Sequence, residues 1–459
     1  MNRRYLQINI AARYPNEPLI PKVAAIDLNR HPLTLTNGAR PQSPWRFGEP
    51  PLPANYIGEK IVLPESFALS QLRLLYIVQH KMIRHLHDAA VLTAVVILGS
   101  SIPGYAYGPI GHEIVGAIAD QRLAGTETGR EVNALLDGLT LSKAAVIADE
   151  IKGWDKNGAD NPNSFHYSRH PRIDTQLRDF WRANPPTHDA NSPTPSHHWF
   201  HYTDVPVVRP EKYGDGTAGR SKWDIVHMIP YCVDVLRGRI PEQNERRVTR
   251  PIAVILLAHY VGDIHQPLHV GAEYFDATGK VVDPDSDKAA LADEGGNTFT
   301  LQLGDEPPPR PGFHQKKFHV FWDLDTVNAL LPTMPETISK EERRMIMESA
   351  QKKVARQMAT EEPKNWKLPL DLPLEKYAEA WADEILPVAR DAHERLNFRQ
   401  VAPLQEEDRV VAAGEAQEKT GSDHGAYRKW ATETVREELH KAGWRLADLL
   451  QKSLFKGSD

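Results

Sequence analysis

The chain has 459 residues, 41% of them hydrophobic, and a formal net charge of −6. This length allows several domains or one large helical domain with long loops, and the apolar content is sufficient for a buried core. The negative charge argues against a protein that grips duplex nucleic acid through a broad basic surface, although bound cations could supply positive charge locally. The single cysteine, Cys232, excludes an intramolecular disulfide framework and any thiolate zinc cluster, so histidines and carboxylates would have to hold zinc.

The first 106 residues differ from the rest of the chain. Residues 1–81 are rich in proline and show little helical pattern. From Met82 the sequence has the layout of a secretory signal peptide, with a basic residue at Arg84, an apolar stretch at 89–98 and small residues up to Ala106. That stretch is too short for a comfortable membrane span, and the alternative is a buried or membrane-anchoring helix. We therefore predict a true start at Met82, cleavage after Ala106, and a secreted or periplasmic product.

After Tyr107 the hydrophobic pattern is mostly helical, which predicts an all-α fold in a single domain. Helices are expected at 111–123, 141–152, 174–183, 222–238 with an interruption at Pro230, about 248–266, 318–331, 341–360, 374–397 and 427–453. Residues 299–303 alternate between apolar and polar side chains, as in a strand, and 400–424 are interpreted as a modest linker. The predicted division is a non-native or disordered extension at 1–81, a signal peptide at 82–106 and a functional domain at 107–452.

The stretch HYVGDIHQPLH (259–269) is the richest in side chains that bind metals. His259 and Asp263 are four residues apart, so on a helix they share one face and can bind one cation. Pro267 cannot donate to the Asp263 carbonyl and crowds it, so the helix should kink or end there. His269 would then point elsewhere than His259.

A second pair with the same spacing, His319 and Asp323, lies in FHVFWD. The alternative for any one of these histidines is a hydrogen-bonded core residue. Two matched pairs, with the carboxylate on the same side each time, favour a multinuclear metal site in a helical protein.

Six motifs follow one another in an informative order: YGPIGH (107–112), IADEIK (147–152), FHYTD (200–204), HYVGDIHQPLH (259–269), EGGN (294–297) and FHVFWD (318–323). This set resembles the three-zinc, single-strand-specific nuclease family of the nuclease S-one/P-one type, whose relatives include zinc-dependent phospholipase C. KAGWRLADLL (441–450) is similar to the closing helix of the family. The resemblance covers about 107–452 and implies a single, mostly helical domain with long loop insertions.

The resemblance implies three zinc ions as cofactors. The first would be held by Asp149, His201, His259 and Asp263. The second, close to it, would take His112, the bridging Asp263, and the amino nitrogen and carbonyl oxygen of Tyr107, which stands where the family has tryptophan. The third would take His269, His319 and Asp323. Imidazole and carboxylate suit zinc, and adjacent cations lower the pKa of water between them, which provides a nucleophile near neutral pH. An uncleaved precursor lacks the amine ligand and is expected to assemble the paired site poorly.

The family's substrate residues carry over to four positions. Lys152 would lie near the scissile phosphate and act with Asp149 and Asp263 in catalysis. Tyr202 would stack on a base, Asp204 would bond the base edge, and Asn297 would contact the base or phosphate. Stacking needs an unstacked base, so it implies a single-strand preference. The plainer alternatives are an exposed helix lysine and a packing aromatic.

Three other features depart from the family pattern or imitate it. The intervals from Asp149 to His201 and from His269 to His319 are longer than in compact members, which predicts loop insertions near the cleft. WADEI (381–385) imitates the motif around Asp149, but its chain order is wrong, so Asp383 is expected at the surface. His265 has no ligand role and is expected behind the ligands or at the surface.

The sequence therefore predicts a zinc-dependent endonuclease that hydrolyses single-stranded DNA and RNA to 5′-nucleotides, with 3′-nucleotidase activity as a further option. We expect a monomer without stable membrane association. The alternatives are a zinc-dependent phospholipase C with the same metal ligands, disfavoured by Asp323, Tyr202 and Asp204, and a metal-bound surface protein without catalysis.

Overall fold

The computed structural model describes residues 5–10, 22–27, 107–187, 195–304, 316–335, 337–406, 409–419 and 426–454. The chain divides into two compact units, Met1–Ala94 and Val95–Asp459. In the first unit, β1 (Tyr5–Ile10) and β2 (Lys22–Asp27) pair as antiparallel strands. The expected signal peptide at 82–106 lies outside the described residues, so its cleavage stays a prediction, as does the proposed division of the chain.

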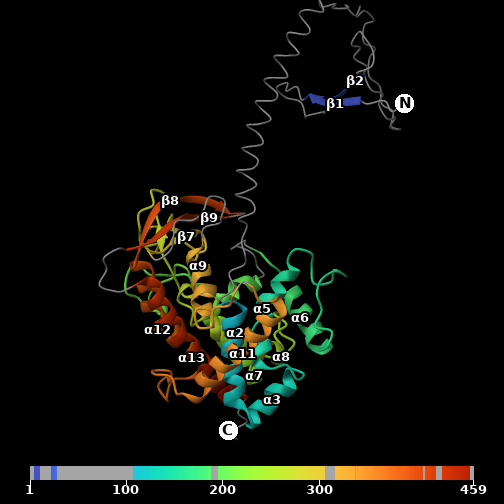
Figure 1. Ribbon diagram of the computed structural model, residues 1–459, viewed down its shortest axis with the longest axis vertical. Coiled ribbons are helices and arrows are strands. Elements are labelled where there is room, and N and C mark those ends of the chain that lie inside the picture. Colours follow the sequence, from blue (N-terminus) through green and yellow to red (C-terminus); the bar gives the residue numbers. More distant parts are fainter. Residues whose placement is uncertain are drawn as a thin grey trace, which may run out of the picture. The chain divides into compact units, whose positions relative to one another are not determined.

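The second unit is mostly helical, which confirms the predicted fold class (Figure 1). Its α-helices are α2 (Gly108–Leu123), α3 (Glu127–Leu135), α4 (Leu141–Ala144), α5 (Ile147–Glu150), α6 (Pro171–Ala183), α7 (Ile225–Leu236), α8 (Arg250–Asp263), α9 (Phe318–Val320), α10 (Thr326–Asn328), α11 (Lys340–Thr360), α12 (Tyr377–Glu394) and α13 (Tyr427–Leu454). Single turns join them: η1 (Ile151–Trp154), η2 (His197–His201), η3 (Tyr213–Asp215), η4 (Pro267–His269), η5 (Phe321–Asp325) and η6 (Leu374–Lys376). In the part of the chain that is described, no helix is both long and apolar enough to cross a lipid bilayer.

Helix α8 is the central support of this unit. Thr249 caps its N-terminus, because its side-chain oxygen accepts a hydrogen bond from the Ile252 N–H at 3.4 Å. Every residue from Pro251 to Asp263 is buried. A helix that is buried on all sides must be enclosed by other elements, and α2, α4, α7 and α13 pack around α8.

The end of α8 agrees with the sequence prediction. Pro267 has no N–H for the Asp263 carbonyl, and that carbonyl instead accepts from the Gln266 N–H at 2.9 Å. The chain then turns into η4, which carries His269 away from the axis of α8. The proline therefore separates His259 and Asp263, at the end of α8, from His269, which lies in η4.

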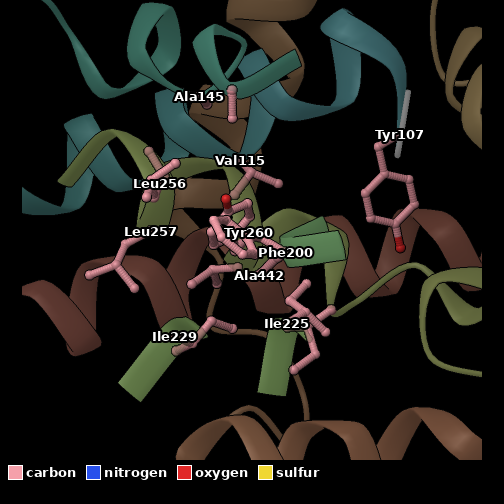
Figure 2. Close-up of a cluster of buried hydrophobic side chains, with 14 of the residues drawn as sticks. Tyr107, Val115, Ala145, Phe200, Ile225, Ile229, Leu256, Leu257, Tyr260 and Ala442 are labelled. Carbon is pink, nitrogen blue, oxygen red and sulfur yellow. The ribbon is translucent and has the colours of Figure 1, made fainter. Parts of the chain in front are cut away.

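Hydrophobic side chains from several elements pack around α8 (Figure 2). The cluster includes Leu256, Leu257 and Tyr260 of α8, Ile225 and Ile229 of α7, Val115 of α2 and Ala442 of α13. Each of these side chains is at most 1% exposed. Truncating one of them, for example Leu257→Ala, would lower the free energy of unfolding by about 2–5 kcal/mol.

Residues 400–406 and 409–418, within the stretch read as a linker, form strands, so that prediction was wrong there. β8 (Leu396–Glu406) and β9 (Arg409–Glu418) pair as an antiparallel hairpin, and β9 also pairs in parallel with β7 (Phe299–Gln302). Figure 1 shows this sheet at one end of the unit. The partner strand β7 lies more than a hundred residues earlier in the chain, so local sequence gave little sign of the pairing. The strand expected at 299–303 is confirmed.

The remaining strands are two-residue pairs. β3 (Val205–Pro206) lies parallel to β4 (Gly271–Ala272), and β5 (Tyr274–Phe275) lies antiparallel to β6 (Leu291–Ala292). The β3–β4 pair joins the segment after η2 to the segment after η4. It therefore holds the chain that follows His201 beside the chain that follows His269.

Two predicted helices differ from the structure in their continuity. The helix expected at 141–152 is divided into α4, α5 and η1, and one reason is that the Ala145 carbonyl accepts a hydrogen bond from His259 instead of continuing the helix ladder. The helix expected at 222–238 is not interrupted, since α7 continues through Pro230. A proline removes one hydrogen bond, and here the buried face of α7 compensates for that loss.

Candidate metal centre

Asp263 lies among three imidazoles at the end of α8. Its Oδ1 is 3.2 Å from His112 Nε2, and its Oδ2 is 3.0 Å from His201 Nδ1 and 3.2 Å from His259 Nε2. Asp149 Oδ1 lies 3.6 Å from His259 Nε2 and 3.8 Å from His201 Nδ1. All five side chains are buried. The structure thus brings together every side chain predicted for the paired zinc ions.

Four elements contribute to this group: α2 carries His112, α5 carries Asp149, η2 carries His201 and α8 carries the other two. The His112 ring stacks on His259 at 3.8 Å between ring centroids. A Cβ atom at Gly262 would lie 2.9 Å from His112 Nδ1, so only glycine leaves room for that ring. The group therefore depends on packing between segments far apart in the sequence.

The hydrogen bonds of His259 fix its tautomer. Its Nδ1 lies 2.6 Å from the Ala145 carbonyl, which can only accept, so Nδ1 carries the proton and Nε2 presents a lone pair. That Nε2 lies 3.0 Å from His201 Nδ1. Both nitrogens of His112 and Asp263 Oδ1 find no hydrogen-bond partner among the described residues. Buried polar atoms are nearly always paired, so this set of donor atoms fits a cation.

A second group is formed by His269, His319 and Asp323. The two Nε2 atoms lie 3.1 Å apart, and Asp323 Oδ2 lies 3.3 Å from His319 Nε2. His269 Nδ1 donates to the His201 carbonyl at 2.9 Å, and His319 Nδ1 donates to the Gly295 carbonyl at 2.8 Å. In the neutral rings both Nε2 lone pairs therefore face each other, which is repulsive unless a cation lies between them.

Neighbouring residues orient this second group. Gln266 Nε2 donates to Asp323 Oδ1 at 2.8 Å and leaves Oδ2 without a partner among the described residues. Asp323 lies in η5, a π-helical turn, and such turns are frequent at functional sites. Gly295 has a φ of +58°, and a Cβ there would lie 2.1 Å from the Leu268 carbonyl oxygen. Glycine is therefore required where the backbone anchors His319.

The charge states of His201, His319 and Asp263 are those of metal ligands. Without a cation two other side chains differ: burial alone would lower the pKa of His259, but the charges of Asp263 and Asp149 raise it, and burial raises the pKa of Asp323 well above its usual range. Burial, reinforced by the charge of Lys152, holds the pKa of His201 well below its usual range, and burial lowers the pKa of His319 to about 3. Burial alone would raise the pKa of Asp263, but the neighbouring imidazoles, above all His259, hold it well below the usual value. Neutral imidazoles and an ionised carboxylate at neutral pH are what zinc requires.

Lys152 lies within this centre. Its Nζ donates to Asp149 Oδ1 at 2.7 Å, and its side chain is only 8% exposed. The alternative of an exposed helix lysine is therefore excluded. An ammonium group at this position can hold Asp149 in place and offers further N–H donors to an anion at the same centre.

Tyr107 stands at the start of α2 in the left-handed conformation, with φ 47°. Its backbone N–H donates to the Asp323 carboxylate, and its carbonyl accepts from the Gly111 N–H at 3.0 Å. Its hydroxyl donates to the carbonyl of His265. The structure thus places the Tyr107 backbone next to a ligand of the second group, and its predicted role as a ligand beside His112 stays a prediction.

His265 is buried, so the surface alternative for it was wrong. Its Nδ1 donates to the Val261 carbonyl at 2.7 Å, which leaves Nε2 to accept from Arg445 Nη1 at 2.9 Å. His265 therefore ties α8 to α13 and holds the Tyr107 side chain through its own carbonyl. Asp383 is half-buried and its Oδ1 accepts from the Tyr213 N–H at 2.7 Å, so it caps η3 and is not simply a surface residue.

The residues predicted to bind a base lie on the chain just after η2. Tyr202 and Asp204 are both half-buried. Burial, together with the nearby charges of Glu294 and Asp293, raises the pKa of Asp204 to about 8. A carboxyl group that keeps its proton at neutral pH can both donate and accept hydrogen bonds.

Arg409 is a residue of this group of side chains, called the base pocket below, that the sequence did not reveal. It extends from the start of β9, pairs with Glu294 at 2.7 Å and hydrogen-bonds the Tyr202 side chain. The β8–β9 hairpin, taken for a linker, thus reaches the predicted base site. The consecutive apolar residues 410–413 were the available signal, but they do not indicate which part of the structure the hairpin contacts.

Asn297 lies in the EGGN turn beside this pocket. Its Nδ2 donates to the Glu294 carbonyl at 3.0 Å, and the side chain is half-buried. The same turn supplies the Gly295 carbonyl that anchors His319. The turn therefore connects the predicted substrate residues with the second metal group.

Comparisons with known proteins agree with this geometry. No curated protein matches the chain. A family model described as S1/P1 Nuclease matches residues 107–455, most of the chain and nearly all of the helical unit. The chain therefore belongs to the S1/P1 nuclease family, whose members are zinc-dependent hydrolases that cleave phosphodiester bonds in nucleic acids.

Proposed function

We propose that this protein is a three-zinc endonuclease that hydrolyses single-stranded DNA and RNA to 5′-nucleotides, with 3′-nucleotidase activity. The observation that carries the proposal is the convergence of metal-binding atoms at two places. Around Asp263, both nitrogens of His112 and Asp263 Oδ1 have no hydrogen-bond partner among the described residues, and in the second group Asp323 Oδ2 has none while the Nε2 atoms of His269 and His319 face each other. We assign two ions to the group around Asp263 and one to the other. The proposed ligands are Asp149, His201, His259 and Asp263 for the first ion, His112, Asp263 and the Tyr107 backbone for the second, and His269, His319 and Asp323 for the third.

The residues of the chain then take distinct parts in the reaction. Bound zinc supplies Lewis acidity at phosphate oxygens and lowers the pKa of the attacking water. Lys152, held by Asp149, donates hydrogen bonds to the phosphate that is being cleaved and stabilises its developing negative charge. Gln266 and the backbone carbonyls of His201 and Gly295 keep Asp323, His269 and His319 in place. Little reorganisation is therefore needed during the reaction.

The pocket beside the metal centre supports a nucleobase as the neighbouring group. The Tyr202 ring would stack on an unpaired base, while Asp204 and Asn297 would bond its edge. A base inside a duplex is covered on both faces, so stacking on a protein ring selects single strands. Glu294 and Arg409, which form an ion pair at 2.7 Å beside Tyr202, add polar groups at which a base edge could bond.

We further propose that the active chain begins at Tyr107, after removal of a signal peptide at 82–106, and that it works as a secreted or periplasmic monomer. A free amine at Tyr107 can coordinate zinc, whereas the amide of an uncleaved chain cannot do so as a neutral donor. An uncleavable precursor should therefore be less active than the mature form. Equal activity of the two forms would contradict the ligand role of the Tyr107 amine and would leave the rest of the proposal unchanged.

The first experiment compares three substrates. Protein beginning at Tyr107 and loaded with zinc is incubated with single-stranded DNA, duplex DNA and phosphatidylcholine micelles, with and without chelator. We expect chelator-sensitive cleavage of the single strand and little cleavage of the duplex. Cleavage of lipid alone would assign the protein to the phospholipase branch, and no turnover on any substrate with metal bound would favour the non-catalytic alternative.

A further inference from the structure

A further group of metal-binding side chains lies outside the two groups assigned above. It consists of Asp155, which follows η1, and of His197 and His198, which begin η2. His198 Nε2 lies 2.6 Å from Asp155 Oδ2, and His197 Nε2 lies 3.2 Å from Asp155 Oδ1. The three ligand atoms lie within 4.8 Å of one another.

The two imidazoles are arranged as ligands of one ion commonly are. They are adjacent in sequence, yet both turn Nε2 toward the same carboxylate, with ring centroids 4.5 Å apart and ring planes at 88°. Two imidazole nitrogens and one carboxylate oxygen are a common zinc ligand set, with the fourth position left for water. His197 is 1% exposed, whereas the side chains of Asp155 and His198 are 18% and 24% exposed, so solvent reaches one side of the group.

A neighbouring residue orients the carboxylate. Trp181 Nε1 donates to Asp155 Oδ1 at 2.7 Å, in the manner of the outer hydrogen bonds that hold metal ligands in place. His197 Nδ1, which is buried, has no hydrogen-bond partner among the described residues.

Hydrogen bonds from the two rings to Asp155 would explain the distances without a metal. That arrangement places Trp181, His197 and His198 as three donors around one partly exposed carboxylate. It uses each Nε2 as a donor, whereas a metal needs each Nε2 as a lone pair. The two alternatives therefore predict different numbers of zinc ions bound per chain, and this number can be measured.

We propose that Asp155, His197 and His198 bind a further zinc-class ion, separate from the ions of the catalytic centre. This ion would join the end of η1 to the start of η2. Those two turns contain Lys152 and His201, so the ion would hold the two segments that carry them together across a long insertion, as structural zinc does in other proteins.

The test counts zinc in the full-length protein by elemental mass spectrometry after dialysis at fixed micromolar free zinc. We expect Asp155→Asn and His198→Gln each to bind one zinc ion fewer per chain than the unchanged protein. His166→Gln is the matched control, because His166 faces a single carboxylate, Asp174, at 3.4 Å in the same part of the chain and is in no three-ligand group. Its zinc count should not change.

Equal zinc counts in all four proteins would overturn the proposal and leave a hydrogen-bond network. So would a difference that emerges only at millimolar free zinc, which would mark an adventitious ion. If Asp155→Asn fails to fold, judged by circular dichroism, the more exposed His198→Gln carries the test. The result is a difference between variants, so it stands whether or not the protein cleaves nucleic acid.

Discussion

The metal centre and the base pocket lie side by side but are built in different ways. The metal ligands lie on buried elements, and backbone carbonyls anchor three of the histidines, His259, His269 and His319. The pocket is lined by half-buried side chains, and its cation, Arg409, arrives on a hairpin from far along the chain. The candidate metal ligands are thus fixed by packing, whereas the side chains proposed to bind a base are less enclosed.

The largest effect is expected from the bridging carboxylate. Asp263→Asn keeps the shape of the side chain but removes the charge that faces three imidazoles. We expect cleavage of single-stranded DNA to fall by about 10³-fold or more, with loss of bound zinc. Initial rates and zinc content measured on the same samples would test this. Full activity at normal zinc content would contradict the assignment of Asp263 as a zinc ligand.

A smaller effect is expected from Gln266, which touches a ligand but not the metal. Gln266→Leu removes the hydrogen bond to Asp323 Oδ1 and the cap that Gln266 Oε1 provides to the Leu268 N–H, so both Asp323 and η4, which carries His269, should be less well oriented. Loss of such an outer contact typically costs 10–100-fold in metal affinity or activity. Titration with a competing chelator would measure the affinity. Gln121→Leu, at an exposed glutamine of α2, is the control and should behave like the unchanged protein.

The base pocket should respond in KM and in substrate choice more than in kcat. Tyr202→Ala removes the stacking ring, and base stacking is worth about 1–3 kcal/mol, so KM for an oligonucleotide should rise about 5- to 150-fold. Tyr202→Phe keeps the ring and loses only the contact with Arg409, so it should stay near the unchanged value. If both substitutions raised KM equally, the hydroxyl and Arg409 would matter and stacking would not.

The same contrast explains what the sequence could and could not reveal. The pairs His259/Asp263 and His319/Asp323 follow a local rule, because residues four apart share a helix face. The carbonyls of Ala145 and Gly295, which set the tautomers of His259 and His319, come from other segments and leave no local pattern.

Non-local pairing also concealed the hairpin. β9 reaches the pocket because it pairs in parallel with β7, and parallel pairing joins residues separated by a long stretch of chain. The predicted linker at 400–424 contains Pro403 and Gly414, both unusual inside strands. The local sequence therefore favoured a linker, and the strands form because β9 pairs with the distant strand β7.

The smallest effect concerns Asp204, whose pKa is raised to about 8 by burial and by the charges of Glu294 and Asp293. The unfolded chain releases this proton near pH 4, so the native state binds one proton more between about pH 4 and 8. Stability from this group is therefore full below pH 4 and is lost as the pH rises toward 8. Asp204→Asn cannot release a proton, so its free energy of unfolding relative to the unchanged protein should increase from pH 5 to pH 8, by about 1 kcal/mol or more.

Urea unfolding at several pH values and fixed free zinc would measure this difference. Tyr202→Phe is the control, because it lies in the same segment and neither side chain titrates between pH 5 and 8. If the free energy of unfolding of Asp204→Asn relative to the unchanged protein stays constant with pH, Asp204 is ionised throughout. It can then only accept hydrogen bonds from a base. A difference that grows would mean that Asp204 holds a proton at neutral pH, and the pocket could then bond base edges that present acceptors as well as donors.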